Sequence, residues 1–451
     1  AGTPVSLAMN LPAVAGEARM QMRGDRLDLD ARDLVLRPTD RMLAALGRPA
    51  TADRPAMRLA ADGSPVLRTN LRVTGLSTTD PAAWPESFRL EAAATPVRVQ
   101  VGETAVPLGP TRWTITREPG APLAVRITGE EGDAATLEAD LRITGLPEPG
   151  RSGRTDPAAL RITGHLEAAD VAAAICDALL GADDLVAATM GATVTARIDA
   201  ADFGTHGGSL RLEASGPTGR VDGTVRGERG ALVVDPAVPL TAVLVVHPLV
   251  RDRVLSRIQP IFSGVSRSDG PLRVVISSAF VPLGDGVSAA AAEFRAEPAT
   301  LWIEPGFDFL GLVAMFDRRG GRPLEATLQP VQGRLAGGRI VTDATRLVLS
   351  RGASIDFAAG GVIDLETRRT DIRATMPLKW LGSVFREARE IADSVTVPLL
   401  ARGPFGTPLE VDPSFDLGRA LLEAGIGGLL ERELDRVVPG LGDLFRGLGG
   451  G

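Results

Sequence analysis

The residues that could carry out chemistry in this chain are few and lie far apart in its sequence. Its three histidines, His165, His206 and His247, occur singly, and no His-Glu-x-x-His pair is present to hold a zinc ion. The segment "GVSRS" at 264–268 lacks the Gly-x-Ser-x-Gly spacing of a nucleophilic serine turn. We therefore expect no catalytic residue in the chain and predict that it is not an enzyme.

Acidic residues offer a second kind of chemistry, the binding of a cation. Asp28, Asp30 and Asp33 are close enough in sequence to suggest calcium. Because Asp28 and Asp30 alternate with leucines, we expect them to spread along the polar face of one strand instead. The single cysteine, Cys176, excludes a disulfide framework and a cysteine metal cluster. No glycine-rich phosphate loop with a lysine is present, so the sequence predicts no metal site and no cofactor.

The composition narrows the class of protein. With a net charge of −7, the chain lacks the basic surface of a nucleic-acid-binding protein. A hydrophobic content of 44% indicates a globular protein rather than a disordered one. Aromatic residues make up only 4% of the chain, so aliphatic side chains and alanine must fill any core, or part of the apolar surface is not filled by protein.

Short alternating segments dominate the chain and predict β-strands. At 360–378, "GGVIDLETRRTDIRATMPL" alternates twice around a polar turn, which predicts a hairpin with one apolar face and one polar face. The same period of two recurs at 137–144, 194–199 and 345–350, with Gly, Pro and Asp clusters between segments. We predict a mainly β fold of about twenty strands.

Four segments have the helical spacing of apolar residues instead. They are 168–180, 249–259, 379–393 and 416–438, and each is predicted to be an amphipathic helix. A helix is about 10 Å wide and neighbouring strands lie about 4.8 Å apart, so four helices cover about eight strands. More than half of the apolar strand face is then uncovered. It must close on itself, stack on another sheet, or hold something that is not protein.

The C-terminal third resembles a known family. Residues 361–365 are similar to a "G-x-(I/V)-D-L" hairpin, and residues 398–408 to a final strand of the form "P-x-x-x-x-G-x-x-x-x-P". The chain ends in the glycine-rich segment "LGDLFRGLGGG". In these features residues 270–451 resemble the C-terminal domain of the AsmA-like family of bacterial envelope proteins, whose relatives include TamB-type proteins. The rest of the chain resembles the family only in its general pattern of arginine- and threonine-faced strands between small helices.

The resemblance implies a long, curved antiparallel β-sheet with a few short amphipathic helices, folded like a taco into a groove with an apolar lining. It implies that this β-groove binds phospholipids or other acyl-chain lipids, or conducts them between membranes, as in outer membrane biogenesis. The lipid-groove lining is expected on the inward face of the C-terminal sheet, at Leu347, Leu349, Ile355, Phe357, Ile363, Leu365, Ile372 and Met376.

The resemblance also implies a place in the periplasm or cell envelope of a two-membrane bacterium, with other envelope proteins as partners. The sequence begins at Ala1 and lacks the family's usual N-terminal membrane helix, so an inner-membrane anchor could be missing from it. We expect three segments: a β-rich 1–165, a helix-plus-strand 166–269, and an AsmA-like 270–451 with a closing helix. The alternative is a structural or adhesive all-β protein whose apolar faces pack dry in sandwiches.

Overall fold

The chain folds as a mainly β protein with a large antiparallel sheet and a few short helices, as the sequence predicts. The computed structural model describes residues 5–11, 14–37, 57–59, 66–80, 83–101, 104–129, 135–148, 156, 158–180, 184–246, 248–252, 264–283, 287–304, 323–349, 354–358, 361–367, 369–377 and 396–404. Two compact units are present, Ala1–Leu240 and Thr241–Gly451, and their boundary falls inside the predicted segment 166–269. Within these described ranges, no helix has the length and apolar character needed to cross a bilayer.

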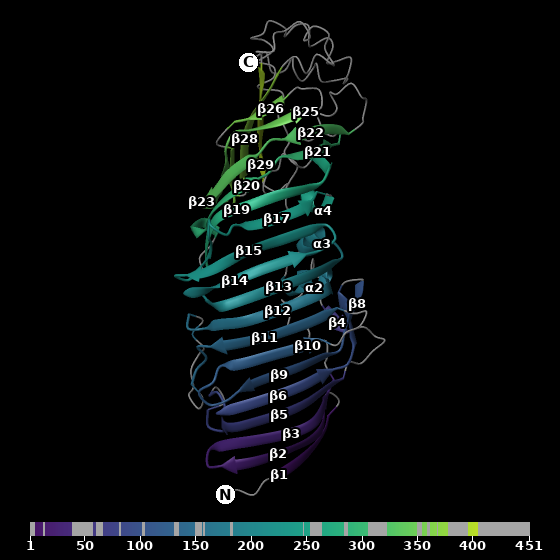
Figure 1. Ribbon diagram of the computed structural model, residues 1–451, viewed down its shortest axis with the longest axis vertical. Coiled ribbons are helices and arrows are strands. Elements are labelled where there is room, and N and C mark those ends of the chain that lie inside the picture. The colour runs from purple at the N-terminus through teal and green to yellow at the C-terminus, as the bar shows by residue number, and fades with distance from the viewer. Residues whose placement is uncertain are drawn as a thin grey trace. The chain divides into compact units, whose positions relative to one another are not determined.

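The sheet of the first unit is a meander in which each strand pairs antiparallel with the next (Figure 1). Its strands are β1 (Val5–Leu11), β2 (Val14–Arg23), β3 (Arg26–Leu36), β5 (Leu67–Ser77), β6 (Ser87–Ala94), β9 (Thr111–Arg117), β10 (Leu123–Gly129), β11 (Thr136–Thr144), β12 (Arg161–Ala172), β13 (Thr193–Gly204), β14 (Gly207–Ser215), β15 (Gly219–Glu228) and β16 (Ala231–Val234). A small separate sheet contains β4 (Met57–Leu59), β7 (Val97–Val101) and β8 (Thr104–Leu108).

Strand register gathers the apolar residues of this meander on one face. Leu71 lies opposite Leu90, Leu90 opposite Ile115, Ile115 opposite Val125, and Val125 opposite Leu141. Because successive side chains of a strand point to opposite faces, the residues two positions away join the same face. The period of two in the sequence is therefore carried from strand to strand as continuous apolar rows.

The opposite face of the same strands is charged. Arg126 lies across from Asp140, with 2.7 Å between Nη2 and Oδ2, and Arg197 lies across from Glu167, with 2.6 Å between Nη1 and Oε1. The hydrogen bond from Arg126 lowers the pKa of Asp140 below its usual value. A slip of one residue would bring these charges to the apolar side, so the pairs help to fix the register.

Two helices cover one end of the apolar face. Ala173 of α2 (Ala173–Leu180) and Met190 of α3 (Leu185–Met190) pack with Val194 of β13. Ala214 and Val221, from β14 and β15, pack against this cluster. The cover therefore lies over the strand ends that carry these residues.

The helix predicted at 168–180 begins only at Ala173. Residues up to Ala172 stay in β12, because Val171 still pairs with Val194 after a β-bulge. Beyond the bulge the chain leaves the sheet and forms α2, whose Ile175 packs against Val99 of the small sheet. The helix thus joins the small sheet to the meander.

Three bulges of the first unit share one construction. At each, an aspartate with positive φ donates its backbone N–H to a side-chain oxygen of the neighbouring strand. Each aspartate stands third in an Ala-x-Asp-apolar segment and lies at a break in the strand register. The pairs are Asp33 with Asn70 at 2.9 Å, Asp170 with Thr195 at 3.3 Å, and Asp202 with Thr163 at 3.3 Å. Such bulges bend and twist the strands that carry them.

The second unit is also an antiparallel meander. Its elements are β17 (Leu240–Val245), α4 (Pro248–Val250), β18 (Val265–Ser268), β19 (Pro271–Pro282), the 3₁₀ helix η3 (Val287–Ala289), β20 (Ala291–Ala296), β21 (Ala299–Ile303), β22 (Leu324–Leu328), β23 (Val331–Ala336), β24 (Arg339–Thr342), β25 (Thr345–Leu349), β26 (Ser354–Phe357), β27 (Gly361–Asp364), β28 (Arg369–Pro377) and β29 (Thr396–Pro404). The hairpin predicted at 360–378 is confirmed by the pairing of β27 with β28. The predicted helices at 379–393 and 416–438, and most of 249–259, lie outside the described residues.

Long strands of the second unit are broken at one line, which we call the crease. The breaks fall at 269–270, 297–298, 329–330 and 343–344, and strands on both sides of them pair with the same neighbours in order. At the crease, Gln329 donates its backbone N–H to the carbonyl of Arg346 at 2.8 Å. The inward residues switch from even to odd numbers across 329–330, from Ala326 and Leu328 to Val331 and Leu335. Each break therefore acts as a bulge that bends the sheet.

Candidate binding surface

The candidate binding surface is the apolar face of the first unit. From β5 to β14 this face is about 35 Å across, since neighbouring strands lie about 4.8 Å apart. On β11 the residues of this face run from Leu137 to Ile143, which is about 20 Å of strand. The outline of this face is therefore about 700 Å².

The centre of this face is only half-buried. We define the central apolar face as the half-buried or exposed side chains of two adjacent rows: Leu71, Leu90, Ile115, Val125, Leu141 and Leu210, and Trp113, Ile127, Leu166, Ile198 and Leu212. Trp113, the largest of them, is 37% exposed. Neighbours on the same sheet hide part of each of these side chains, and the smaller Ala92, Ala139 and Ala200 of the same rows are buried between them.

The second unit gives the contrasting case. Most of the lining residues predicted there are fully buried: Leu347, Leu349, Ile355, Ile363 and Ile372 are each 3% exposed or less. Leu365 is half-buried, and the side chains of Phe357 and Met376 lie outside the described part of the structure. The five buried side chains share one inward face, and that face is covered by protein.

A buried arginine borders the central apolar face at the end opposite α2 and α3. Arg117, the last residue of β9, lies across from Phe88 and is 5% exposed. Its Nη2 donates to the carbonyl of Pro147 at 2.5 Å, and its Cζ lies 5.0 Å from the centre of the Trp84 ring. Burial lowers the pKa of the guanidinium. The loops before β6 and after β11 therefore close over a positive charge on an otherwise apolar face.

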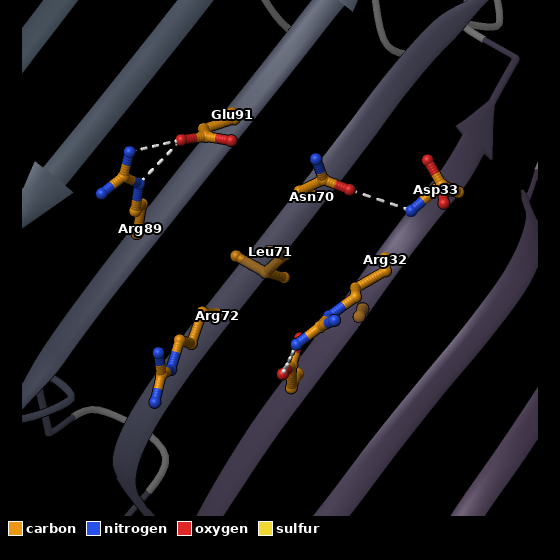
Figure 2. Close-up of a pocket in the computed structure, with 9 residues that line it drawn as sticks. Arg32, Asp33, Asn70, Leu71, Arg72, Arg89 and Glu91 are labelled. Atoms are coloured by element: carbon orange, nitrogen blue, oxygen red, sulfur yellow. Dashed lines mark hydrogen bonds and ion pairs between the residues drawn. The ribbon is translucent and has the colours of Figure 1, made fainter.

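The charged face of the sheet contains a polar depression of about 330 Å³ on β3, β5 and β6 (Figure 2). Arg89 binds Glu91 with 2.8 Å from Nε to Oε1, and Arg32 binds Asp30 through two hydrogen bonds. The hydrogen bond from Arg32 lowers the pKa of Asp30, and the charge of Arg72 lowers it further. Because Asp30 is ionised and already paired at neutral pH, it is poorly suited to proton transfer.

The residues considered for chemistry in the sequence stay dispersed. His165 and His206 are exposed on β12 and in the turn after β13, and His247 lies outside the described residues. Asp28 accepts the backbone N–H of Gly75 at 2.9 Å and pairs with an arginine. Cys176 is half-buried in α2, and burial raises the pKa of its thiol. In the described ranges, no three His, Cys, Asp or Glu side chains are grouped to hold a metal ion.

Sequence reasoning missed both the central apolar face and Arg117. The signal for the arginine is present in "TRWTITR", where alternation places Trp113, Ile115 and Arg117 on one face. An arginine at an apolar position of a strand marks a place where burial of a charge must be explained. Comparison with protein-family models, curated proteins and solved structures found no match to this chain.

Proposed function

We propose that the protein is a non-enzymatic, lipid-handling component of a bacterial cell envelope, whose central apolar face binds the acyl chains of phospholipids. The observation that carries this proposal is the pairing of a largely half-buried apolar face with an opposite face rich in exposed charged side chains on one sheet. A sheet of this kind needs an apolar partner on one side only.

Acyl chains suit this face in both chemistry and size. Their burial is driven by the hydrophobic effect, which is non-directional and stabilises by about 25 cal/mol per Å² of apolar surface removed from water. The hydrocarbon core of a bilayer is about 30 Å thick, so a single acyl chain extends about 15 Å. The face, about 20 Å along its strands, is long enough to hold one.

The envelope setting comes from the resemblance of residues 270–451 to AsmA-like proteins. It supports a periplasmic, membrane-associated location, lipid transport between membranes in outer membrane biogenesis, an inner-membrane anchor in a longer chain, and envelope proteins as partners. The predicted C-terminal lining belongs to the same proposal. Because side chains such as Ile363 are covered by protein, lipid reaches them only if that cover opens.

Site-specific photo-crosslinking tests where lipid binds. A photoreactive residue is placed at Leu141 on the central apolar face and, for comparison, at Ile363 in the second unit. The matched controls are their chain neighbours Arg142 and Asp364, which point to the other face of the same strands. We expect lipid adducts at Leu141 and none at Arg142, read by mass spectrometry after incubation with phospholipid vesicles.

The outcomes separate the proposal from its alternative. Capture at Ile363 as well as Leu141 would extend lipid binding to the predicted C-terminal lining. Equal capture at Leu141 and Arg142, or no phospholipid in native mass spectra of the gently purified protein, would contradict the proposal. A protein without bound lipid favours a structural or adhesive role, for which the burial of Leu347, Leu349, Ile355 and Ile363 in the second unit is the supporting observation.

A further inference from the structure

Arg117 has hydrogen-bonding capacity that the described chain does not use. Its Nη2 is bonded to the Pro147 carbonyl, but Nε and Nη1 are buried and have no hydrogen-bond partner. A buried polar group without a partner is costly, and a buried charge without a counter-ion is costlier still. In native proteins such groups are normally satisfied by a partner, by water or by a ligand.

No carboxylate of the described residues neutralises this charge. Arg117 takes part in none of the ion pairs among them, and burial alone accounts for the lowered pKa. The described residues therefore supply no counter-ion to this guanidinium.

We infer that Arg117 is the binding site for the anionic headgroup of the lipid, with the phosphate accepting hydrogen bonds from its Nε and Nη1. This inference rests on the proposed function, since it assigns the headgroup end of the same bound lipid. Guanidinium groups pair with phosphate through short, charge-assisted hydrogen bonds. The headgroup then lies at the Arg117 end of the face.

The position of Arg117 sets the orientation of the acyl chains. It shares its row with Phe88, and Leu90 and Ala92 of the same strand continue the face toward the end that α2 and α3 cover. Acyl chains extending from the phosphate therefore lie along the strands over the central apolar face. An amphiphile bound in this way satisfies the buried charge and covers the half-buried apolar rows together.

The Trp84 ring lies against the guanidinium of Arg117. It lies 5.0 Å from the guanidinium and 6.4 Å from the ring of Phe88, centre to centre. Because Nε and Nη1 are shielded from solvent, the phosphate enters only when the indole moves off the guanidinium. A cation–π contact is weaker than charge-assisted hydrogen bonds to phosphate, so this exchange is favourable.

Calorimetric titration with two amphiphiles of equal chain length tests the inference. Dodecyl phosphate carries the anion and dodecyl maltoside does not, and both are used below their micelle concentrations. We expect the wild-type protein to bind dodecyl phosphate about tenfold more tightly, in line with a charge-assisted hydrogen bond. Arg117→Met should bind both amphiphiles alike, while Arg142→Gln, an exposed arginine of the charged face, should keep the wild-type preference.

The variants keep the test decisive. Replacing an unneutralised buried charge by methionine is expected to leave the melting temperature unchanged or raise it, which circular dichroism checks. If Arg117→Met does not fold, Arg117→Lys replaces it, and we expect a smaller preference because an ammonium lacks the planar array of donors. An unchanged preference in either variant overturns the inference.

This experiment gives one result if the inference fails and another if the proposed function fails. If the wild type binds both amphiphiles equally, the headgroup site is wrong and acyl-chain binding stands. If it binds neither, the proposed function fails, and titration with inorganic phosphate then decides the anion site alone. Phosphate binding that is lost in Arg117→Met supports a site for a free anion, and absence of phosphate binding overturns it.

Discussion

The backbone N–H of Asp33 donates a hydrogen bond to Oδ1 of Asn70, 37 residues later in the chain, at 2.9 Å. Asp33 has a φ of 50°, a backbone conformation that residues other than glycine seldom adopt. The carboxamide of Asn70 therefore holds a strained residue at the edge of the depression on the charged face, and Figure 2 shows this bond between neighbouring strands.

Removal of that carboxamide should weaken the bulge. Asn70→Ala leaves the Asp33 N–H without its acceptor, and we expect the free energy of unfolding to fall by about 1 kcal/mol. Urea denaturation monitored by circular dichroism measures the change. Thr128→Ala, an exposed strand position of β10, is the control and should change stability by less than about 0.5 kcal/mol. Equal losses in both variants would show that the bond has no special role.

Gly164 in β12 should tolerate no side chain. It has a φ of 132°, and a Cβ atom there would lie 1.9 Å from the carbonyl oxygen of Asp140. Gly164→Ala is expected to destabilise by about 3 kcal/mol or more, because backbone rather than a flexible side chain must move. Gly207→Ala serves as the control, since nothing lies within 4 Å of its added Cβ. Similar melting temperatures for the two variants would contradict this account.

Asp177 joins the two helices that cover the end of the apolar face. It is 5% exposed, and its Oδ1 and Oδ2 accept the backbone N–H groups of Val186 and Ala187 at 2.8 and 2.9 Å. Asp177→Ala should cost about 1–2 kcal/mol through loss of this cap. Asp177→Asn keeps one acceptor oxygen, so its stability should lie between those of the wild type and the alanine variant. Hydrogen exchange should quicken at Val186 and Ala187 in the alanine variant, and unchanged exchange there would exclude a capping role.

The ion pair between Arg126 and Asp140 should make a small, pH-dependent contribution. The folded state lowers the pKa of Asp140, so the stabilisation is present above the carboxyl's usual pKa and is lost as pH falls through the folded value. At pH 7, Arg126→Ala should cost less than about 1 kcal/mol, because the pair is exposed and screened. The difference from wild type should vanish in acid, once the pH lies below the lowered pKa of Asp140. A difference that persists there would assign the effect to packing of the arginine stem.

Local alternation explains why so many strands could be predicted. Ile363 and Ile372 fall on the buried face of the hairpin as expected, while Asp364 and Arg373 fall on the other. A period of two is a property of each strand alone, and antiparallel neighbours preserve it. The sequence also predicted correctly that helices would be short and few.

Breaks within strands could not be predicted in the same way. The segment 354–365 alternates as if it were one strand, but the structure divides it into β26 and β27. The segment 168–180 shows the same limit. It has helical spacing, but β12 continues past Asp170 to Ala172 before α2 begins. Whether a chain bulges or turns depends on hydrogen bonds offered by the neighbouring strand, such as the one from Asp170 to Thr195.

The sequence pattern also could not predict whether an apolar face is exposed or covered by the rest of the chain. Leu141 and Ile363 stand in similar alternating strands, but one is half-buried and the other 1% exposed. The difference depends on what the rest of the chain places over each strand, and periodicity contains no information about that. The predicted lining was therefore assigned to the unit with the stronger motifs rather than to the unit with the less covered face.

In the meander of the first unit, the width of the apolar face grows with the number of strands. From β9 to β11 each strand bonds only to the strand before it and the strand after it in the meander, so a hairpin inserted at one of these turns would lengthen the sheet without disturbing distant pairings. Two further strands would widen the apolar face by about 10 Å and leave its depth along the strands unchanged. Under the proposed function, the number of hairpins would set how many acyl chains lie side by side, and strand length would set how long each chain can be.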